Sequence, residues 1–134
     1  MATKIFVNLP VKDLKRSMAF FTALGYAFNP QFTDENAACM IISDDIHAML
    51  LVESFFKTFT KKAIVDAKNS TEVLVALSHD AREDVDRIVK AAVAAGGRTY
   101  SEPNDHGFMY QWGFEDPDGH IWEQFWMNPT HVER

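Results

Sequence analysis

Cysteine is almost absent from this sequence, because Cys39 is the one thiol among 134 residues. A lone cysteine forms no disulfide within the chain, and no thiol-rich spacing exists for a structural zinc or iron–sulfur site. Basic residues are also few, with 13 Lys and Arg against 19 Asp and Glu and a formal net charge of −6. Phosphate binding needs clustered Lys and Arg, so we expect no nucleic-acid partner.

Long apolar runs and several enzyme motifs are missing as well. No run approaches the ~20 apolar residues of a membrane-spanning helix, and residues 1–10 have no signal-peptide pattern. We therefore expect no membrane partner and a cytoplasmic protein. The sequence has no Gly-x-Gly-x-x-Gly, phosphate loop, nucleophile elbow or His-Glu-x-x-His motif. Nucleotide binding, serine hydrolysis and zincin chemistry therefore have no support.

The hydrophobic residues that are present, 47% of the chain, predict a strand, a helix and three strands in the first half. Ile5, Val7 and Leu9 occupy alternate positions, as in a strand. Asp13 then caps a helix that Gly25 ends. Three extended runs follow, at residues 26–32, 37–43 and 47–53.

The second half repeats this order. After a strand at 72–78, we expect a helix that begins in a capping box formed by Asp80 and Glu83 and ends at Gly96. Gly96 follows Gly25 by 71 residues, and the same shift aligns the two helical segments. Turn sequences at 103–105 and 116–119 separate three more predicted strands, at 98–101, 107–115 and 120–127.

These patterns predict a single α+β domain, residues 1–134, built from two tandem βαβββ modules. The first module spans 1–54, a connecting segment spans 55–70, the second module spans 71–128, and a tail spans 129–134. A helix covers only one face of its sheet, so we expect a curved mixed sheet whose other faces surround a central pocket.

Three stretches of the chain resemble the vicinal oxygen chelate superfamily, which contains glyoxalases, bleomycin-resistance proteins and extradiol dioxygenases. The last stretch is the most specific, because Glu123 follows an Asp-Pro-Asp-Gly turn by four residues, as in the lactoylglutathione-lyase-like branch. The resemblance implies the glyoxalase/bleomycin resistance/dihydroxybiphenyl dioxygenase-like fold and a homodimer. The stretches are residues 9–17 with Phe20, Phe21, Leu24 and Gly25, residues 94–97, and residues 114–123.

The resemblance also implies one divalent metal ion, which enzymes of this family hold with side chains from the first and last strand of each module. Three of the four ligand positions fall at or near Phe6, Met49 and Val73, which are not the usual ligands. Glu123 occupies the fourth position and is the metal-ligand candidate.

Two titratable residues are candidates for catalysis. Glu123 shares its predicted strand face with Ile121 and Phe125, where a carboxylate must be paired, protonated or bound to a ligand. The structural alternative is a salt bridge to a Lys or Arg at the edge of the core. His106 lies beside Gly107 in a predicted loop, as a ligand or general base, or as an ordinary solvated histidine.

A second group of residues is predicted to bind the ligand. Phe6, Asn8, Met49 and Phe125 are expected to line the pocket near Glu123. An aromatic stripe on one strand adds further candidates, although a packed core under the helices, or a dimer interface, explains such a stripe equally simply. The candidates on that strand are Tyr110, Gln111 and Trp112.

The function that these predictions favour is binding or transformation of a small molecule in an apolar pocket. One hypothesis, from the resemblance, is a glyoxalase-like lyase or isomerase, or a dioxygenase-related enzyme, with metal-dependent chemistry on adjacent oxygens. The alternative is a metal-free binding protein of the bleomycin-resistance type. A structural dimer with a vestigial pocket is a third possibility.

Overall fold

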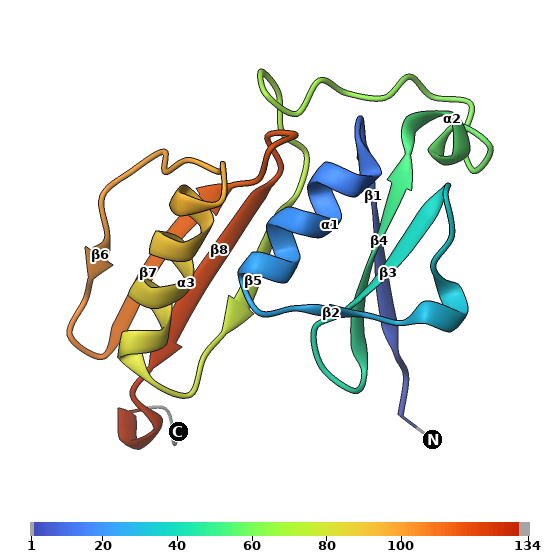
Figure 1. Ribbon diagram of the computed structural model, residues 1–134. Coiled ribbons are helices and arrows are strands. Elements are labelled where there is room, and N and C mark those ends of the chain that lie inside the picture. Colours follow the sequence, from blue (N-terminus) through green and yellow to red (C-terminus); the bar gives the residue numbers. More distant parts are fainter. Residues whose placement is uncertain (1, 132–134) are drawn as a thin grey trace. The chain divides into compact units, whose positions relative to one another are not determined.

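The computed structural model describes residues 2–131, which form two compact units (Figure 1). Unit 1 ends at Val65, and unit 2 begins at Asp66. Each unit has a strand, a helix and three further strands, in that order. The predicted α+β class and the two tandem βαβββ modules are therefore confirmed.

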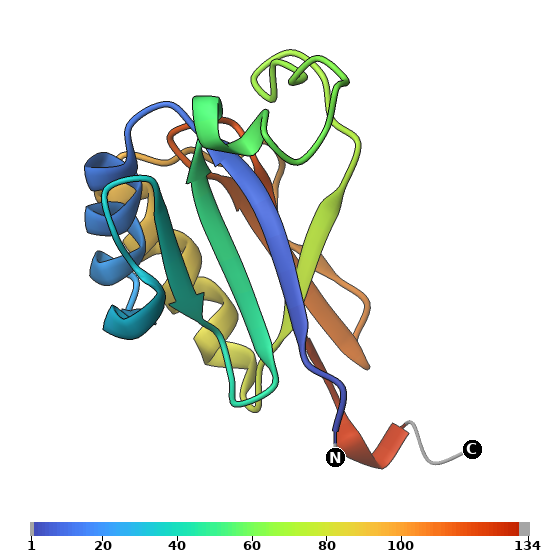
Figure 2. The ribbon, with the colours of Figure 1, turned by 90° about the vertical axis from the view of Figure 1, so that its right-hand side faces the viewer.

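Unit 1 contains a four-stranded mixed sheet in the order β1-β4-β3-β2. Strand β1 runs parallel to β4, while the other neighbouring pairs are antiparallel. Helix α1 lies to one side of this sheet (Figure 2). The elements are β1 (Ile5–Val11), α1 (Leu14–Ala23), β2 (Ala27–Phe28), the 3-10 helix η1 (Pro30–Phe32), β3 (Ala37–Ile41), β4 (Ile46–Val52) and α2 (Glu53–Phe56).

Unit 2 repeats this topology, with the sheet order β5-β8-β7-β6. Its first and last strands, β5 and β8, are the parallel pair, as β1 and β4 are in unit 1. The elements are β5 (Leu74–Ser78), α3 (Arg82–Ala94), β6 (Asn104–Asp105), β7 (Met109–Glu115), β8 (Ile121–Met127) and the 3-10 helix η2 (Pro129–His131).

The two long helices end in the same way. The N–H of Tyr26 donates to the carbonyl of Phe21 at 3.0 Å, and the N–H of Gly97 donates to that of Ala92 at 2.8 Å. Each bond spans a glycine of positive φ at the carboxyl end of its helix, which is Gly25 after α1 and Gly96 after α3. Both bonds keep the 71-residue shift, so the weak sequence repeat reflects a structural one.

The two helices begin differently, and here one prediction is wrong. The carboxylate of Asp13 accepts the N–H of Arg16 at 3.1 Å, as expected of a cap. In α3, however, the N-cap residue is Ala81, no side chain caps it, and the capping box expected at Asp80 does not form. Glu83 lies in the first turn instead, where its charge interacts favourably with the helix dipole.

The strand predicted at 26–32 is shorter than expected. Strand β2 stops at Phe28, because the side chain of Asn29 accepts the N–H of Gln31 at 3.0 Å and starts η1 at Pro30. The Thr33 hydroxyl then donates to the Asn29 carbonyl at 2.7 Å. These local bonds replace ladder bonds that a longer strand would make.

The strand predicted at 98–101 is also wrong. Only Arg98 pairs with β7, as an isolated bridge to Glu115, and pairing resumes at β6, inside the segment predicted to be a turn. The carbonyl of Ser101 accepts instead from the Trp112 indole N–H at 2.9 Å. Residues 99–103 therefore bulge away from the ladder between two paired points.

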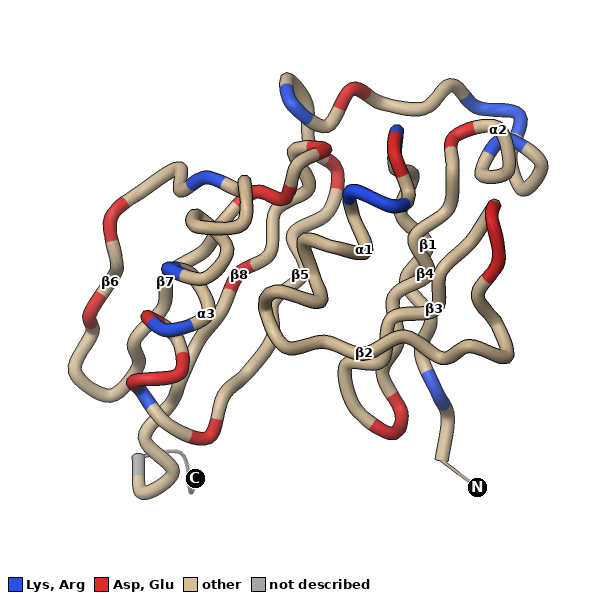
Figure 3. The backbone as a smooth tube through the Cα atoms, viewed as in Figure 1, with Lys and Arg blue, Asp and Glu red and all other residues tan. Residues whose placement is uncertain are grey.

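The distribution of Lys and Arg matches the low number of basic residues in the sequence. Figure 3 shows Lys and Arg scattered singly or in pairs along the described chain. No helix within residues 2–131 combines the length and apolar character needed to cross a membrane.

Candidate functional site

The sheet of unit 2 has one face packed against α3. On this face Phe114 and Trp122 are 1% exposed, and Gln124 is fully buried. The hydroxyl of Tyr110 donates to the carboxylate of Asp86 in α3 at 2.5 Å. The aromatic stripe of β7 thus belongs mainly to the core, which is one of the three interpretations that the sequence allowed.

Glu123 lies on the opposite face of this sheet, which we call the far face of unit 2. Its cross-strand neighbours are Gly113 on β7 and Ala76 on β5. It is half-buried, and strand alternation places Ile121 and Phe125 beside it, as predicted. The far face consists of Leu74, Ala76, Ser78, Met109, Gln111, Gly113, Glu115, Ile121, Glu123, Phe125 and Met127.

Tyr100 is the hydrogen-bond partner of Glu123. Its hydroxyl donates to the Glu123 carboxylate at 3.2 Å, from the bulge that precedes β6. A Cβ atom at Gly113 would collide with this hydroxyl, so the tyrosine reaches the carboxylate only because the strand has a glycine there. The salt bridge considered from the sequence is not found, because no Lys or Arg within residues 2–131 forms an ion pair with Glu123.

The environment of Tyr100 keeps its hydroxyl protonated. Burial raises its pKa above the usual value, and the negative charge of Glu123 and the hydrogen bond to it raise the pKa further. Tyr100 therefore donates to Glu123 throughout the physiological pH range. The result is a carboxylate held by a neutral donor, with apolar neighbours on its own strand and a second carboxylate, that of Glu115, on the same face.

His106 lies at the tip of the hairpin between β6 and β7. Its backbone N–H donates to the Met109 carbonyl at 2.8 Å, and the Asp105 carboxylate accepts from Gly107 at 2.8 Å. Met109 precedes Gly113, the neighbour of Glu123, by four residues, which is about 13 Å along a strand. The structure therefore does not bring the two catalytic candidates together.

The other candidate ligand-binding residues of unit 2 are divided between the two faces of its sheet. Gln111 and Phe125 are cross-strand partners and share the far face with Glu123. Tyr110 and Trp112 alternate to the face that packs against α3. The structure thus groups only the first two with the carboxylate.

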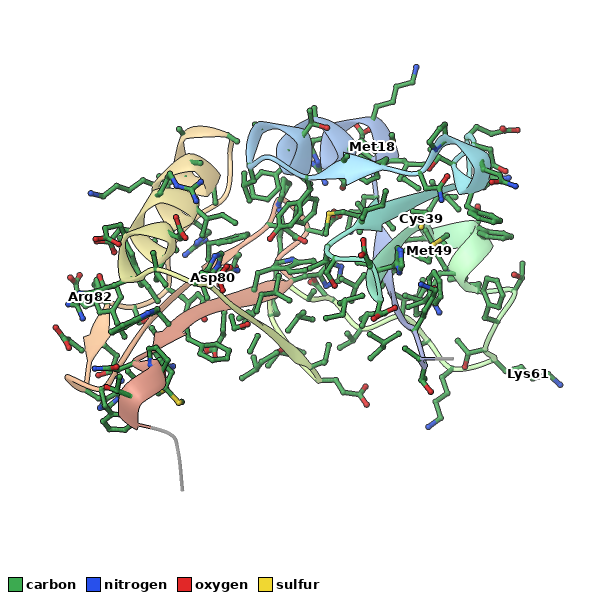
Figure 4. All side chains as sticks on the ribbon, turned by 90° about the horizontal axis from the view of Figure 1, so that it is seen from below. Met18, Cys39, Met49, Lys61, Asp80 and Arg82 are labelled. Atoms are coloured by element: carbon green, nitrogen blue, oxygen red, sulfur yellow. The ribbon has the colours of Figure 1, made fainter. Side chains whose placement is uncertain are left out.

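The candidates of unit 1 lie together on the face of its sheet away from α1, which we call the far face of unit 1. Phe6 pairs with His47, their rings stacked at a centroid distance of 4.6 Å, and Asn8 pairs with Met49. Met49 lies beside Cys39 on β3 (Figure 4). Phe6, Asn8 and Met49 therefore lie on one face, which combines an aromatic ring, an amide and a thioether above the buried Cys39.

The residues present do not fit the divalent metal that the resemblance implies. Phe6 and Val73 offer no ligand atom, and Met49 offers only a soft thioether, which hard cations disfavour. The cross-strand neighbours of Glu123 also lack ligand side chains. In the described part of the chain, no group of three His, Cys, Asp or Glu side chains has the arrangement of a metal site.

The Asp-Pro-Asp-Gly turn has a structural role of its own. The buried carboxylate of Asp116 accepts the backbone N–H groups of Asp118 and His120 and the indole N–H of Trp122, all at 2.9–3.0 Å. Burial is the main reason that its pKa is raised. The most specific motif of the sequence therefore organises a turn and fixes a core tryptophan.

A cleft of about 160 Å³ adjoins this turn in unit 2. Lys68 and Arg98 oppose Glu115 and Asp116 in its wall, so both charge signs face it. Glu123 and the other candidates do not line it. We assign it no function. The full lining is Lys68, Gly96, Arg98, Glu115, Asp116, Pro117 and Gly119.

Comparison with known proteins identifies the architecture. Residues 3–43 match the family model described as bleomycin resistance protein-like N-terminal. A hypothetical protein from S. aureus superposes with a TM-score of 0.79 and 26% identity, over 93% of this chain and 94% of that chain. A glyoxalase/bleomycin resistance protein/dioxygenase family enzyme from Burkholderia phytofirmans PsJN gives 0.77 and 17%, over 94% and 99%.

The chain has the vicinal oxygen chelate fold. The resemblance inferred from the sequence is confirmed at this level. The fosfomycin resistance protein FosX from Mesorhizobium loti shares the vicinal oxygen chelate fold too, with a TM-score of 0.70 and 15% identity over 98% of this chain and 97% of that chain. No curated protein matches this sequence.

Sequence reasoning missed Tyr100 and Gly113, the two residues that complete the surroundings of Glu123. Tyr100 was assigned to a strand that does not form, so its side-chain direction was not predictable. Gly113 did carry a signal, because a glycine inside an aromatic strand often marks the close approach of another group.

Proposed function

We propose that this chain binds a small molecule on the far face of unit 2, with Glu123 as the polar anchor. The observation that supports the proposal is a half-buried carboxylate among Ile121, Phe125 and Ala76 whose hydrogen-bond partner is the neutral hydroxyl of Tyr100. A carboxylate kept only for structure is more often neutralised by a cation.

The chemistry of this face indicates the kind of ligand. An ionised carboxylate offers about four lone-pair sites, and a single donor leaves most of them for another partner. The surrounding apolar side chains supply contact area for an apolar body. The expected ligand therefore combines an N–H or O–H group with an apolar flank.

We also propose that the far face of unit 1 is, by itself, a surface for apolar contacts. Phe6 and Met49 supply an aromatic ring and a polarisable thioether, and Asn8 supplies an amide. This combination suits a binding protein of the bleomycin-resistance type, and we propose that it acts as a homodimer.

The test is a ligand screen by thermal shift with charge-matched variants. A compound of the expected kind should raise the Tm of the wild-type protein and of Glu72→Gln, which removes an exposed charge elsewhere in unit 2. The same compound should give little or no shift with Glu123→Gln. An equal shift in all three proteins would refute Glu123 as the anchor.

A second candidate function is lyase or isomerase chemistry with Glu123 as the metal ligand or the proton-transfer base, without His106, which lies at the far end of β7. It is favoured by the position of Glu123, which is the last-strand ligand position that the family resemblance implies. Elemental analysis after dialysis against mixed divalent metals separates the two. Near-stoichiometric metal that is lost in Glu123→Gln would favour the enzyme, and equal trace metal in both proteins would favour the binding protein.

A further inference from the structure

Tyr100 has one hydroxyl proton, and the direction in which it donates determines what the site presents to a ligand. That proton is directed to Glu123 at 3.2 Å. With the proton committed, the phenol oxygen has only lone pairs to offer, as has the ionised carboxylate. An incoming molecule on this face therefore meets hydrogen-bond acceptors from both residues.

We infer that Tyr100 and Glu123 form a polarity filter, which admits ligands that bring an N–H or O–H donor and rejects ligands whose polar group can only accept. The inference rests on the proposed function and adds Tyr100 as a specificity-determining residue. Amines and alcohols are the expected classes, while carboxylates and ketones are excluded because two acceptors would face each other unpaired.

The backbone around Tyr100 is arranged to hold this geometry. One end of the bulge is fixed by the Arg98 bridge to Glu115. The other end is fixed where Asp105 on β6 forms a 2.5 Å ion pair with Arg82 in α3. The tyrosine is 39% exposed and Glu123 is half-buried, so neither residue is closed off from solvent.

Gly113 makes the contact possible. Its φ is not in the left-handed region, so the backbone itself does not require glycine. The glycine is needed because any Cβ at this position would collide with the Tyr100 hydroxyl. The one glycine of β7 therefore lies next to the hydrogen bond between Tyr100 and Glu123.

The test measures NMR titrations of three probes that share a phenyl body and differ in the polar group. They are 2-phenylethylamine as a donor, 4-phenylbutan-2-one as a neutral acceptor and 3-phenylpropanoate as an anionic acceptor. The neutral ketone separates hydrogen-bond direction from charge. The proteins are the wild type, Glu123→Leu, Tyr100→Phe and the double variant, with Glu72→Leu as the control for the lost charge.

The expected result is a reversal of selectivity that depends on Tyr100. In the wild type the amine binds and the ketone binds weakly or not at all. In Glu123→Leu, whose side chain can neither accept the Tyr100 proton nor donate one, the amine weakens and the affinity for the ketone rises by at least about fivefold, because the Tyr100 hydroxyl is free to donate to the ketone. In the double variant this gain disappears, although the phenyl ring at position 100 is kept.

The remaining outcomes separate the two proposals. If Glu123→Leu leaves amine binding unchanged, or no probe binds the wild type at 10 mM, the proposed function is overturned and the filter with it. If amine binding weakens but the ketone gains nothing, or its gain survives in the double variant, the filter is overturned while Glu123 remains the anchor. Backbone NMR spectra of each variant show whether it is folded.

Discussion

The far faces of the two units differ in chemistry although the units share one topology. In unit 1 this face carries Phe6 stacked on His47, with Met49 beside Cys39. In unit 2 the same side of an equivalent sheet carries a carboxylate and a tyrosine hydroxyl. The helix-covered faces are mainly apolar in both units, although Gln124 is buried in unit 2. Burial constrains one face of each sheet in the same way, while the other face is free to diverge toward function.

The largest expected effect tests whether the helix-covered faces of the two units contribute equally to stability. Phe21 is fully buried in unit 1, and Phe114 is 1% exposed in unit 2. Truncating either to Ala should lower the free energy of unfolding by about 3 to 5 kcal/mol, because each leaves a cavity in its core. Urea unfolding followed by circular dichroism measures both. A loss below about 1 kcal/mol in one variant would break the comparison.

The next effect concerns the turns before the last strand of each unit. Asp116→Ala removes a buried acceptor of three N–H groups and should cost about 3 kcal/mol. Asp45 in the corresponding turn of unit 1 is exposed and pairs with Lys4 at 3.2 Å. Asp45→Ala should therefore cost less than about 1 kcal/mol. Urea midpoints that shift equally would show that the buried turn of unit 2 has no special role.

A smaller effect concerns the helix starts. Asp13→Ala removes the cap of α1 and should destabilise the protein by about 1 kcal/mol. Ala81→Asp introduces the missing cap of α3 and should stabilise it by about 0.5 to 1 kcal/mol, helped by the helix dipole. Thermal unfolding in low salt measures both signs. A destabilised Ala81→Asp would mean that the start of α3 has no room for a cap.

The smallest expected effect concerns the ionisation of the three tyrosines, because their raised pKa values change the stability only at alkaline pH. Burial raises the pKa of Tyr26 in unit 1 and Tyr110 in unit 2 to about 12, and that of Tyr100 is also raised. A raised folded pKa gives stability that is complete below the unfolded value of about 10 and is lost as the pH rises through the folded value. Absorbance at 295 nm should therefore show almost no ionisation at pH 10.

Gly113→Ala sharpens this titration. The added methyl group displaces the Tyr100 hydroxyl from Glu123, so the pKa of one tyrosine should fall toward its usual value while the other two stay high. The Tyr100→Phe variant lacks the ionisation of Tyr100, so a comparison with it shows whether the lowered pKa belongs to this tyrosine. If Gly113→Ala left the absorbance curve unchanged, the close contact between Gly113 and Tyr100 would be wrong.

The sequence predicted the elements that have local causes. Alternation placed Glu123 with Ile121 and Phe125, the cap at Asp13 was correct, and the glycine stops were found at the right residues. These features depend on neighbours within a few positions, which a single sequence displays directly.

The rest depended on contacts between distant residues. The bulge before β6 arises because the Trp112 indole, not a strand, satisfies Ser101. The partner of Glu123 follows from this bulge, and the sequence offered no basis for choosing Tyr100 over a Lys or Arg. The family resemblance predicted the fold correctly. It did not predict the chemistry, because three of the four metal-ligand positions of the family hold Phe6, Met49 and Val73.

The short strand β6 also bears on how the molecule avoids aggregation through the edge of its sheet. An outer strand with a full row of unpaired N–H and C=O groups is a template for another chain. Here that edge pairs through only two residues, its preceding segment bulges out of register, and Pro103 withholds an N–H. The interruption that delivers Tyr100 to Glu123 thereby also deprives this edge of a regular surface for edge-to-edge aggregation.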